Sequence, residues 1–193
     1  MKQLEVTVKV FNTLDEINNI LSRQGFNVIR KSRVEDKYLS QKEIKENNIY
    51  DVLSSCVLLR YLNANGEVFT KITYKNKEYT GDNVLTETKI NVNIDSISNA
   101  NKLFSALGFK HIVDVNYDVI VYEKDGLELA FQNVERLGLL LEGESNKDFT
   151  DSSVEDILSA KKTLADNIRT LGLNISDDYD IKKAYELIKL NIK

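Results

Sequence analysis

Hydrophobic and polar residues alternate without interruption at the start of the chain. In the segment LEVTVKV, residues 4–10, four apolar side chains fall on one face of an extended chain, and Glu5, Thr7 and Lys9 fall on the other. Successive side chains of a strand point to opposite faces, so this segment is predicted to be a β-strand with one buried face. The alternation leaves two readings of the polar face open: it meets solvent, or it lines a charged site.

Two segments have apolar residues at helical spacing followed by a glycine. In the first, Thr13 and Glu16 have the spacing of a capping box, and Gly25 stands where the helix would end. The second, residues 96–108, also ends at a glycine. A pattern typical of a long strand follows each helix, so we interpret the chain as two similar halves.

Strand patterns elsewhere come in pairs joined by turn sequences. Asn-Ala-Asn-Gly at residues 63–66 separates two β-rich runs, and Lys-Asp-Gly at residues 124–126 separates two more. Further strands are predicted at 84–93 and 138–144, which makes about eight in all. Antiparallel hairpins in two similar halves predict an α+β fold, built on an antiparallel eight-stranded barrel with flanking helices.

Two regions fall outside this pattern of strands. Residues 40–54 are predicted to be a short helix or a loop, opened by a second capping-box spacing at Ser40. Near residue 149 the pattern becomes helical, with Ser152 at the start of a C-terminal helical pair. No linker rich in Gly or Ser precedes this pair. We therefore expect one domain over 1–193, with a barrel region at 1–148 and a helical tail at 149–193 packed on it.

Composition narrows the class of protein. The chain has 193 residues, with 42% hydrophobic and 29% charged residues, which is ordinary for a globular domain. Its net charge of -4 argues against nucleic acid as a partner. A single cysteine, Cys56, allows no disulfide within the chain and favours a reducing, cytoplasmic location. No secretory signal or transmembrane run is expected.

The barrel would have a charged interior if the polar faces point inward and the apolar faces pack outward against helices. Such an interior would contain Glu5, Thr7, Lys9, Arg60, Lys71, Thr73, Lys75, Glu87, Lys89, Asn91, Glu142 and Glu144. Carboxylates two residues apart on a strand can hold a hard divalent cation such as Mg²⁺ or Mn²⁺, and Lys or Arg can bind phosphate oxygens. The alternative is that these alternating charges form an ordinary solvent face.

Several segments resemble the CYTH family, also called triphosphate tunnel metalloenzymes. EVTVKV resembles its Glu-x-Glu-x-Lys signature, and the segments DKYL, VLLRYL, KITYKN and LELAFQNVERLGLLLEGE follow in the family's order. The tail LADNIRTLGL is similar to the class IV adenylate cyclase-like branch. The family also includes thiamine triphosphatases and inorganic triphosphatases. The resemblance implies a tunnel whose bases bind a triphosphate and whose glutamates bind a divalent metal.

Particular roles follow only from this resemblance. It implies metal ligands at Glu5, Glu142 and Glu144, phosphate-binding bases at Lys9, Arg60 and Lys75, and catalytic roles for Glu5, Lys9 and Glu87. Lys71 is added as an extra tunnel base. The implied cofactor is Mg²⁺ or Mn²⁺, and the implied partner is ATP or another phosphorylated small molecule. No membrane partner is expected, and a homodimer stays open.

Departures from the family pattern leave the activity open. Five positions where the family carries charge are neutral here: Thr7, Leu62, Tyr117, Val119 and Gln132. The first hypothesis is a nucleotide- or triphosphate-binding tunnel protein, with weakened activity as a triphosphatase or cyclase. The alternative is a non-catalytic ligand sensor or interaction module. A shifted register in strand 110–123 would place Asp114, Asn116 and Asp118 inside the barrel instead.

Overall fold

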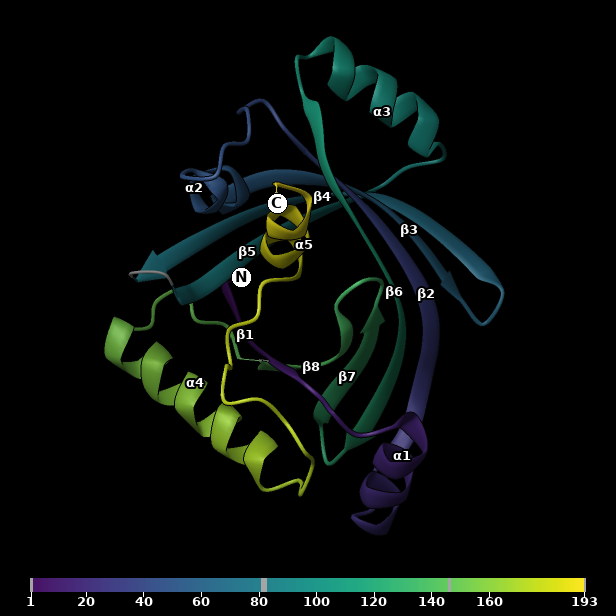
Figure 1. Ribbon diagram of the computed structural model, residues 1–193, viewed down its shortest axis with the longest axis vertical. Coiled ribbons are helices and arrows are strands. Elements are labelled where there is room, and N and C mark those ends of the chain that lie inside the picture. Colours follow the sequence, from purple (N-terminus) through teal and green to yellow (C-terminus); the bar gives the residue numbers. More distant parts are fainter. Residues whose placement is uncertain (1, 81–82, 146, 193) are drawn as a thin grey trace.

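Eight antiparallel strands close into a barrel within residues 2–80, 83–145 and 147–192, which are the residues that this computed structural model describes. Around the barrel the order is β1-β5-β4-β3-β2-β6-β7-β8 (Figure 1). The strands are β1 (Lys2–Lys9), β2 (Asn27–Ser40), β3 (Ser55–Ala64), β4 (Glu67–Thr80), β5 (Asn83–Asn93), β6 (Lys110–Lys124), β7 (Leu127–Val134) and β8 (Gly138–Ser145). The predicted α+β class and the antiparallel eight-stranded barrel are confirmed.

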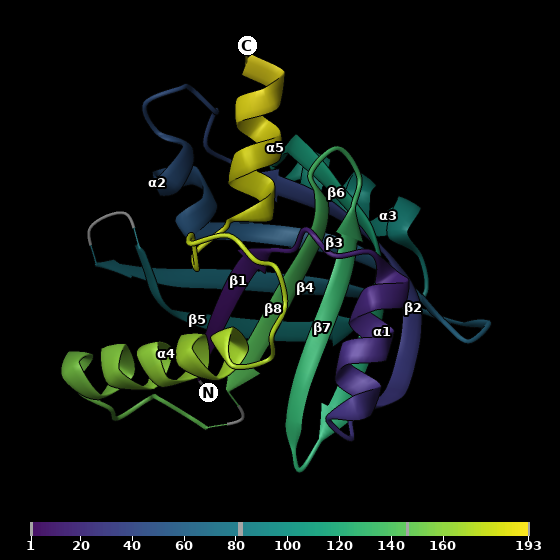
Figure 2. The ribbon, with the colours of Figure 1, turned by 60° about the horizontal axis from the view of Figure 1, so that its bottom comes forward.

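Helices cover parts of the barrel's outer surface and one of its ends. They are α1 (Leu14–Arg23), α2 (Ile49–Ser54), α3 (Ile97–Ala106), α4 (Val154–Arg169) and α5 (Lys183–Ile192). In Figure 2, α1 and α4 lie against the outside of the barrel, and α5 stands away from it at one end. None of the described helices is long and apolar enough to cross a membrane.

The apolar face of β1 is buried, as the alternation predicted, and it points outward, as the family resemblance implied. Leu4, Val6 and Val8 are buried in one cluster with residues of the two helices on this side, including Leu21 of α1 and Ile168 of α4. These aliphatic side chains leave water by packing between strand and helix, which is the main stabilising contribution at this layer. The polar face of β1 is consequently left to line the barrel interior.

One end of the barrel is covered by α5 and α2. Ala184 and Leu187 of α5 share a buried cluster with Leu53 of α2 and with side chains of β3 and β6. The rings of Tyr50 and Tyr185 stack between the two helices, with centroids 4.5 Å apart and an interplanar angle of 14°. In Figure 1, α5 therefore appears over the centre of the ring of strands.

The first predicted helix has the ends that its sequence indicated. Thr13 Oγ1 accepts a hydrogen bond from the Glu16 amide at 3.3 Å, and Glu16 Oε2 accepts one from the Thr13 amide at 2.8 Å. Gly25 follows the helix with a φ of 86°, a left-handed conformation that suits glycine. The predicted capping box and helix stop are thus confirmed.

Two other predicted helix starts are wrong. Ser40 does not cap a helix, because it is the last residue of β2 and pairs with β6, and α2 begins only after Asn48. The cap of α4 lies one residue later than predicted, because Ser153 rather than Ser152 accepts the hydrogen bond from the Asp156 amide. At Ser40 the pairing of β2 with β6 prevents the helix start that the capping-box spacing suggested. At Ser152 the hydroxyl of the next residue, Ser153, caps the helix instead.

The register of β6 follows the family pattern rather than the shifted alternative. Tyr117 and Val119 are buried and line the barrel interior, whereas the side chains of Asp114 and Asp118 are 50% and 66% exposed. Asp118 lies 3.6 Å from Arg33 on the outer surface. The prediction that two family charges have become neutral and inward-facing is therefore correct in its geometry.

Candidate functional site

The inward faces of the strands enclose two cavities along the barrel axis. The one nearer α5, which we call the proximal cavity, measures about 40 Å³ and is lined by residues that include Lys75, Lys77 and Lys183. The other, which we call the distal cavity, measures about 270 Å³ and is lined by residues that include Lys71 and Lys89. The interior is thus a polar tunnel, unlike the apolar interior of most small barrels.

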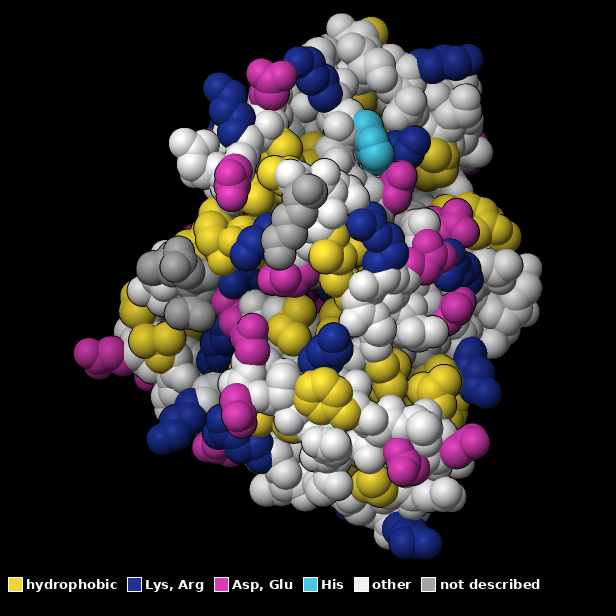
Figure 3. All heavy atoms as spheres, in the orientation of Figure 1, with side chains coloured by type: hydrophobic (Ala, Val, Ile, Leu, Met, Phe, Trp, Pro, Cys, Tyr) yellow, Lys and Arg dark blue, Asp and Glu magenta, His cyan; other side chains and the backbone are white. Residues whose placement is uncertain are grey.

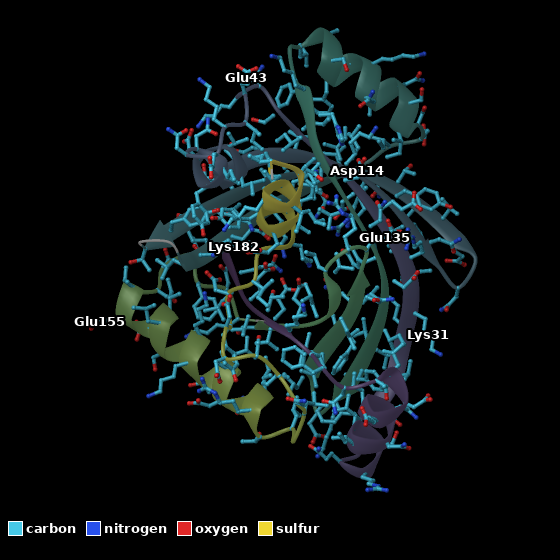
Figure 4. The ribbon with its side chains drawn as sticks, viewed as in Figure 1. Lys31, Glu43, Asp114, Glu135, Glu155 and Lys182 are labelled. Atoms are coloured by element: carbon cyan, nitrogen blue, oxygen red, sulfur yellow. The ribbon has the colours of Figure 1, made fainter. Side chains whose placement is uncertain are left out.

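The face of the molecule that carries α5 shows no patch of a single charge. Acidic and basic side chains are interspersed over the face that carries α5, with neither sign dominating (Figure 3). In Figure 4, Lys182 lies beside α5, over the ring of strands, while Lys31, Glu43 and Glu155 lie at the periphery. The charged side chains that line the tunnel therefore form the candidate functional site.

Arg60 and Tyr117 separate the two cavities, because both residues line both of them. Arg60 Nε and Nη2 each lie 2.5 Å from a carboxylate oxygen of Asp36, and Nη2 lies 3.5 Å from the Tyr117 hydroxyl. Burial lowers the pKa of Arg60, but the adjacent Asp36 carboxylate outweighs it and raises that pKa. A bidentate pair of this kind commits the guanidinium to an internal partner.

Lys89 stands at the meeting point of three carboxylates. Its Nζ lies 3.4 Å from Glu5 Oε2, 3.2 Å from Glu87 Oε2 and 3.2 Å from Glu144 Oε1. Lys75 adds a second ammonium group 3.2 Å from Glu87 Oε1. The glutamates predicted from three different strands are therefore brought together, around an ammonium group.

Burial and these ammonium groups act in opposition on the glutamates. Burial raises the pKa of Glu5, but the charges of Lys89 and Lys75 outweigh it and lower that pKa below its ordinary value. The pKa of Glu87 is likewise lowered, because nearby lysines outweigh its burial. The pKa of Glu144 is instead raised, because burial and the neighbouring Glu5 charge exceed the effect of Lys89.

The Glu142 carboxylate pairs with a different ammonium group, that of Lys183 on α5. Lys183 Nζ lies 2.6 Å from Glu142 Oε2 and 2.6 Å from Gln132 Oε1, and 5.2 Å from the centre of the Tyr117 ring. Burial lowers the pKa of Lys183, but the Glu142 carboxylate outweighs it and raises that pKa. The helix thus closes the tunnel with a side chain that also neutralises a predicted metal ligand.

Two predicted phosphate-binding lysines differ in their surroundings. Lys9 is exposed at the end of β1 and lines neither cavity, so the structure does not bring it to the other predicted site residues. Lys71 faces the distal cavity, and no ion pair to it is found among the described residues. Burial and the neighbouring Arg60 charge lower the pKa of Lys71.

Asp36 and Lys183 were not among the residues expected in the interior, and Lys89 was expected there but was given no role. Asp36 lies in the segment DKYL, whose likeness to the Asp-x-Tyr segment of the family was a usable signal. Lys89 follows Glu87 at a spacing of two, so strand alternation places both on one face. Nothing in the pattern of Lys183 distinguished it from the other lysines of a basic helix.

The carboxylates in this arrangement do not fit a divalent metal. Within the part of the chain that the structure describes, no group of three or more His, Cys, Asp or Glu could hold a metal ion. Glu5 and Glu144 face each other across β1 and β8, but Lys89 lies between them and Glu87. Opposite Glu142 stands Thr7, which carries no charge, and Lys183 occupies the remaining side.

Comparisons with known proteins extend over almost the whole chain. No family model matches the sequence. A Methanocaldococcus jannaschii protein named "putative adenylate cyclase" is 30% identical over 189 residues, which is 94% of this chain and 96% of that protein. That match, between chains of nearly equal length, goes beyond a shared fold.

Solved structures give the same fold. The protein PH1819 of Pyrococcus horikoshii has a TM-score of 0.72 at 24% identity, covering 98% of this chain and 100% of that one. A Hippeastrum protein, described as a "putative adenylyl cyclase" with a dominant triphosphatase activity, has a TM-score of 0.62 at 13% identity, covering 99% and 96%. Together, the closed eight-stranded tunnel and the full-length match show that this chain belongs to the class IV adenylate cyclase-like branch of the CYTH family.

Proposed function

We propose that this protein binds a phosphorylated small molecule in its distal cavity and is weak or inactive as a phosphoanhydride enzyme. One observation carries the proposal: Lys71 presents an ammonium group to this cavity without a carboxylate partner among the described residues. Arg30 lines the same cavity and adds positive charge near it, whereas Lys89, which also lines it, is paired with three glutamates. Ammonium and guanidinium groups are the usual protein partners of phosphate oxygens.

The charge balance favours a ligand with fewer charges than a full triphosphate. Arg60, Lys75 and Lys183 each contact an internal carboxylate, so only part of the positive charge in the tunnel is available to a ligand. A triphosphate would have to compete with these buried pairs, and breaking a buried pair is costly. A nucleotide or a compound with one or two phosphates suits the cavity better.

Weak turnover follows from the same contacts. In an active tunnel of this kind, Glu5, Glu142 and Glu144 would hold Mg²⁺ or Mn²⁺, which would polarise the phosphate. Here their carboxylates are engaged by Lys89 and Lys183. The proposal therefore retains the binding part of the family's chemistry and reduces the catalytic part, as a ligand-sensing protein would require.

Calorimetry and thermal shift with ATP, inorganic triphosphate, thiamine triphosphate and pyrophosphate test the binding. We expect micromolar binding of at least one of them, weakened about 10–100-fold in Lys71→Ala, because a hydrogen bond to a charged group contributes about 1.5–3 kcal/mol. Lys31→Ala, which removes a peripheral lysine of the same charge, is the matched control (Figure 4). Absence of any stabilisation by these four compounds would refute the proposal.

Turnover is measured with the same compounds in Mg²⁺ and in Mn²⁺. We expect rates no faster than those of the Glu142→Ala/Glu144→Ala double variant. Efficient hydrolysis or cyclisation that this double variant abolishes would show that the carboxylates act as a catalytic metal site after all, and would restore the enzyme reading.

A further inference from the structure

We infer that the Lys89 ammonium group takes the place of a divalent metal ion in this tunnel. Its Nζ lies 3.2–3.4 Å from carboxylate oxygens of Glu5, Glu87 and Glu144. These residues come from β1, β5 and β8, which are adjacent in the barrel. Carboxylates from three neighbouring strands thus converge on one point, and a covalently attached cation occupies that point.

The burial of this cluster explains why a cation must be there. Glu87 is 1% exposed and Glu5 is 20% exposed, whereas Glu144, which stands opposite Glu5, is 36% exposed at the edge of the cluster. Carboxylates grouped out of water repel one another unless positive charge lies between them. Lys89 supplies that charge as part of the chain, so the cluster is stable without any bound ion.

The same ammonium group excludes a metal. Mg²⁺ requires oxygens at about 2.0–2.1 Å and Ca²⁺ at about 2.3–2.6 Å, so an incoming ion would need the position that Nζ now holds. Lys75 and Lys77 lie 3.2 Å and 3.6 Å from Glu87 and would add further repulsion. The tunnel therefore contains the fixed single charge of Lys89 in place of the double charge of a removable metal ion.

The replacement of a metal by Lys89 also affects a ligand in the distal cavity, because Lys89 lines that cavity. An anion bound there would meet a permanent ammonium group instead of a metal, and its affinity would not depend on divalent ions. This consequence rests on the proposed function, whereas the exclusion of metal from the carboxylate cluster does not.

Replacing Lys89 by an uncharged residue tests the inference as a gain of metal binding. Lys89→Gln keeps a side chain of similar length with hydrogen-bond donors, and Lys89→Met is a second variant that keeps the packing. We expect the wild-type protein to take up no Mn²⁺, as measured by the electron paramagnetic resonance signal of the free ion. We expect Lys89→Gln to bind one Mn²⁺ at least about 100-fold more tightly, since a charge repelling a divalent ion is gone.

Two controls locate the new metal site. Lys71→Gln removes the same charge from the same cavity but touches none of the three carboxylates, so it should bind no Mn²⁺. Adding Glu144→Gln to Lys89→Gln should abolish the gained binding. Wild-type uptake of Mn²⁺ that Glu144→Gln removes would overturn the inference, as would a folded Lys89→Gln protein that binds no better than wild type. If neither Lys89 variant folds, wild-type uptake decides alone.

Measurements of pyrophosphate binding separate this inference from the proposed function. Pyrophosphate is titrated into the wild-type protein with EDTA and then with Mg²⁺, and we expect equal affinities. Binding that requires Mg²⁺ would overturn the inference while leaving a phosphate-binding function in place. Failure of pyrophosphate and the other phosphate compounds to bind at all would refute the proposed function, and the Mn²⁺ measurements would still decide the role of Lys89.

Discussion

Neutralising Asp36 should destabilise the protein and at the same time strengthen anion binding. The Asp36 side chain is 2% exposed and holds Arg60, which is 22% exposed, through two contacts of 2.5 Å. Asp36→Asn leaves the guanidinium enclosed without its counter-charge, while its volume stays nearly the same. Loss of one partner of a buried pair costs about 3–5 kcal/mol, and we use about 3 kcal/mol because Arg60 is partly exposed.

Thermal and urea denaturation measure this cost. For a domain of this size, about 3 kcal/mol corresponds to a fall in Tm of roughly 6–12 °C. The double variant Asp36→Asn/Arg60→Met removes both charges and should recover most of the loss, because neutral replacement of a buried pair is often close to neutral in stability. With Arg60→Met alone, the four proteins form a double-mutant cycle that isolates the pair.

Anion affinity should move in the opposite direction. Arg60 lines both cavities, so release from Asp36 makes its guanidinium available to a ligand. We expect pyrophosphate to bind about 10-fold more tightly to Asp36→Asn, which is less than the full contribution of a charged hydrogen bond. A Tm within about 2 °C of wild type would refute the assigned burial cost. A lower Tm with unchanged affinity would show that Arg60 does not reach the ligand.

Three further predictions concern other parts of the tunnel wall. The folded-state pKa of Glu5 is below its ordinary value of 4.5, so its contribution to stability is complete above pH 4.5 and is lost as the pH falls below that value. In urea denaturation between pH 3 and 7, the free energy of unfolding of Glu5→Gln should therefore fall less steeply toward acid pH than that of the wild-type protein. An equally steep fall would contradict this. In Gly143→Ala the new methyl group would lie 3.1 Å from Ile168 of α4, and overpacking should lower the free energy of unfolding by about 1–3 kcal/mol in urea titrations; a neutral result would mean that α4 shifts freely. Lys9→Ala should leave pyrophosphate affinity within about twofold in calorimetry, since Lys9 lines neither cavity, and a tenfold loss would place Lys9 in the site.

Local patterns correctly predicted which side chains share a face of a strand. The alternation in residues 4–10 placed Leu4 and Glu5 on opposite faces, and in the structure Leu4 packs against the helices while Glu5 lines the tunnel. Thr13 and Glu16 form their capping box because both partners lie within one helical turn. Tyr117 and Val119 share one face of β6 by strand alternation, but the family resemblance, not the alternation, indicated that this face points inward. The capping box and the alternation of faces each depend on residues close in the sequence.

The partners across the tunnel could not be predicted in this way. The bidentate contact of Asp36 with Arg60 and the contact of Lys183 with Glu142 join residues 24 and 41 positions apart. Lys9 has the correct parity for the interior, yet it lies beyond the enclosed part of β1. How far each strand reaches into the barrel depends on the register of its neighbours, which the alternation of one strand does not contain.

By itself, the sequence determined most of the secondary structure, the alternation of faces along the strands, and a likeness to a family of charged tunnels. Only the tertiary structure decided how the charges inside that tunnel are paired. Closure of eight strands brings Glu5, Glu87 and Glu144 to one ammonium group, and α5 carries Lys183 to Glu142. The physical reason is that burial makes every charge in the tunnel depend on its nearest counter-charge, and barrel closure sets which residues are nearest.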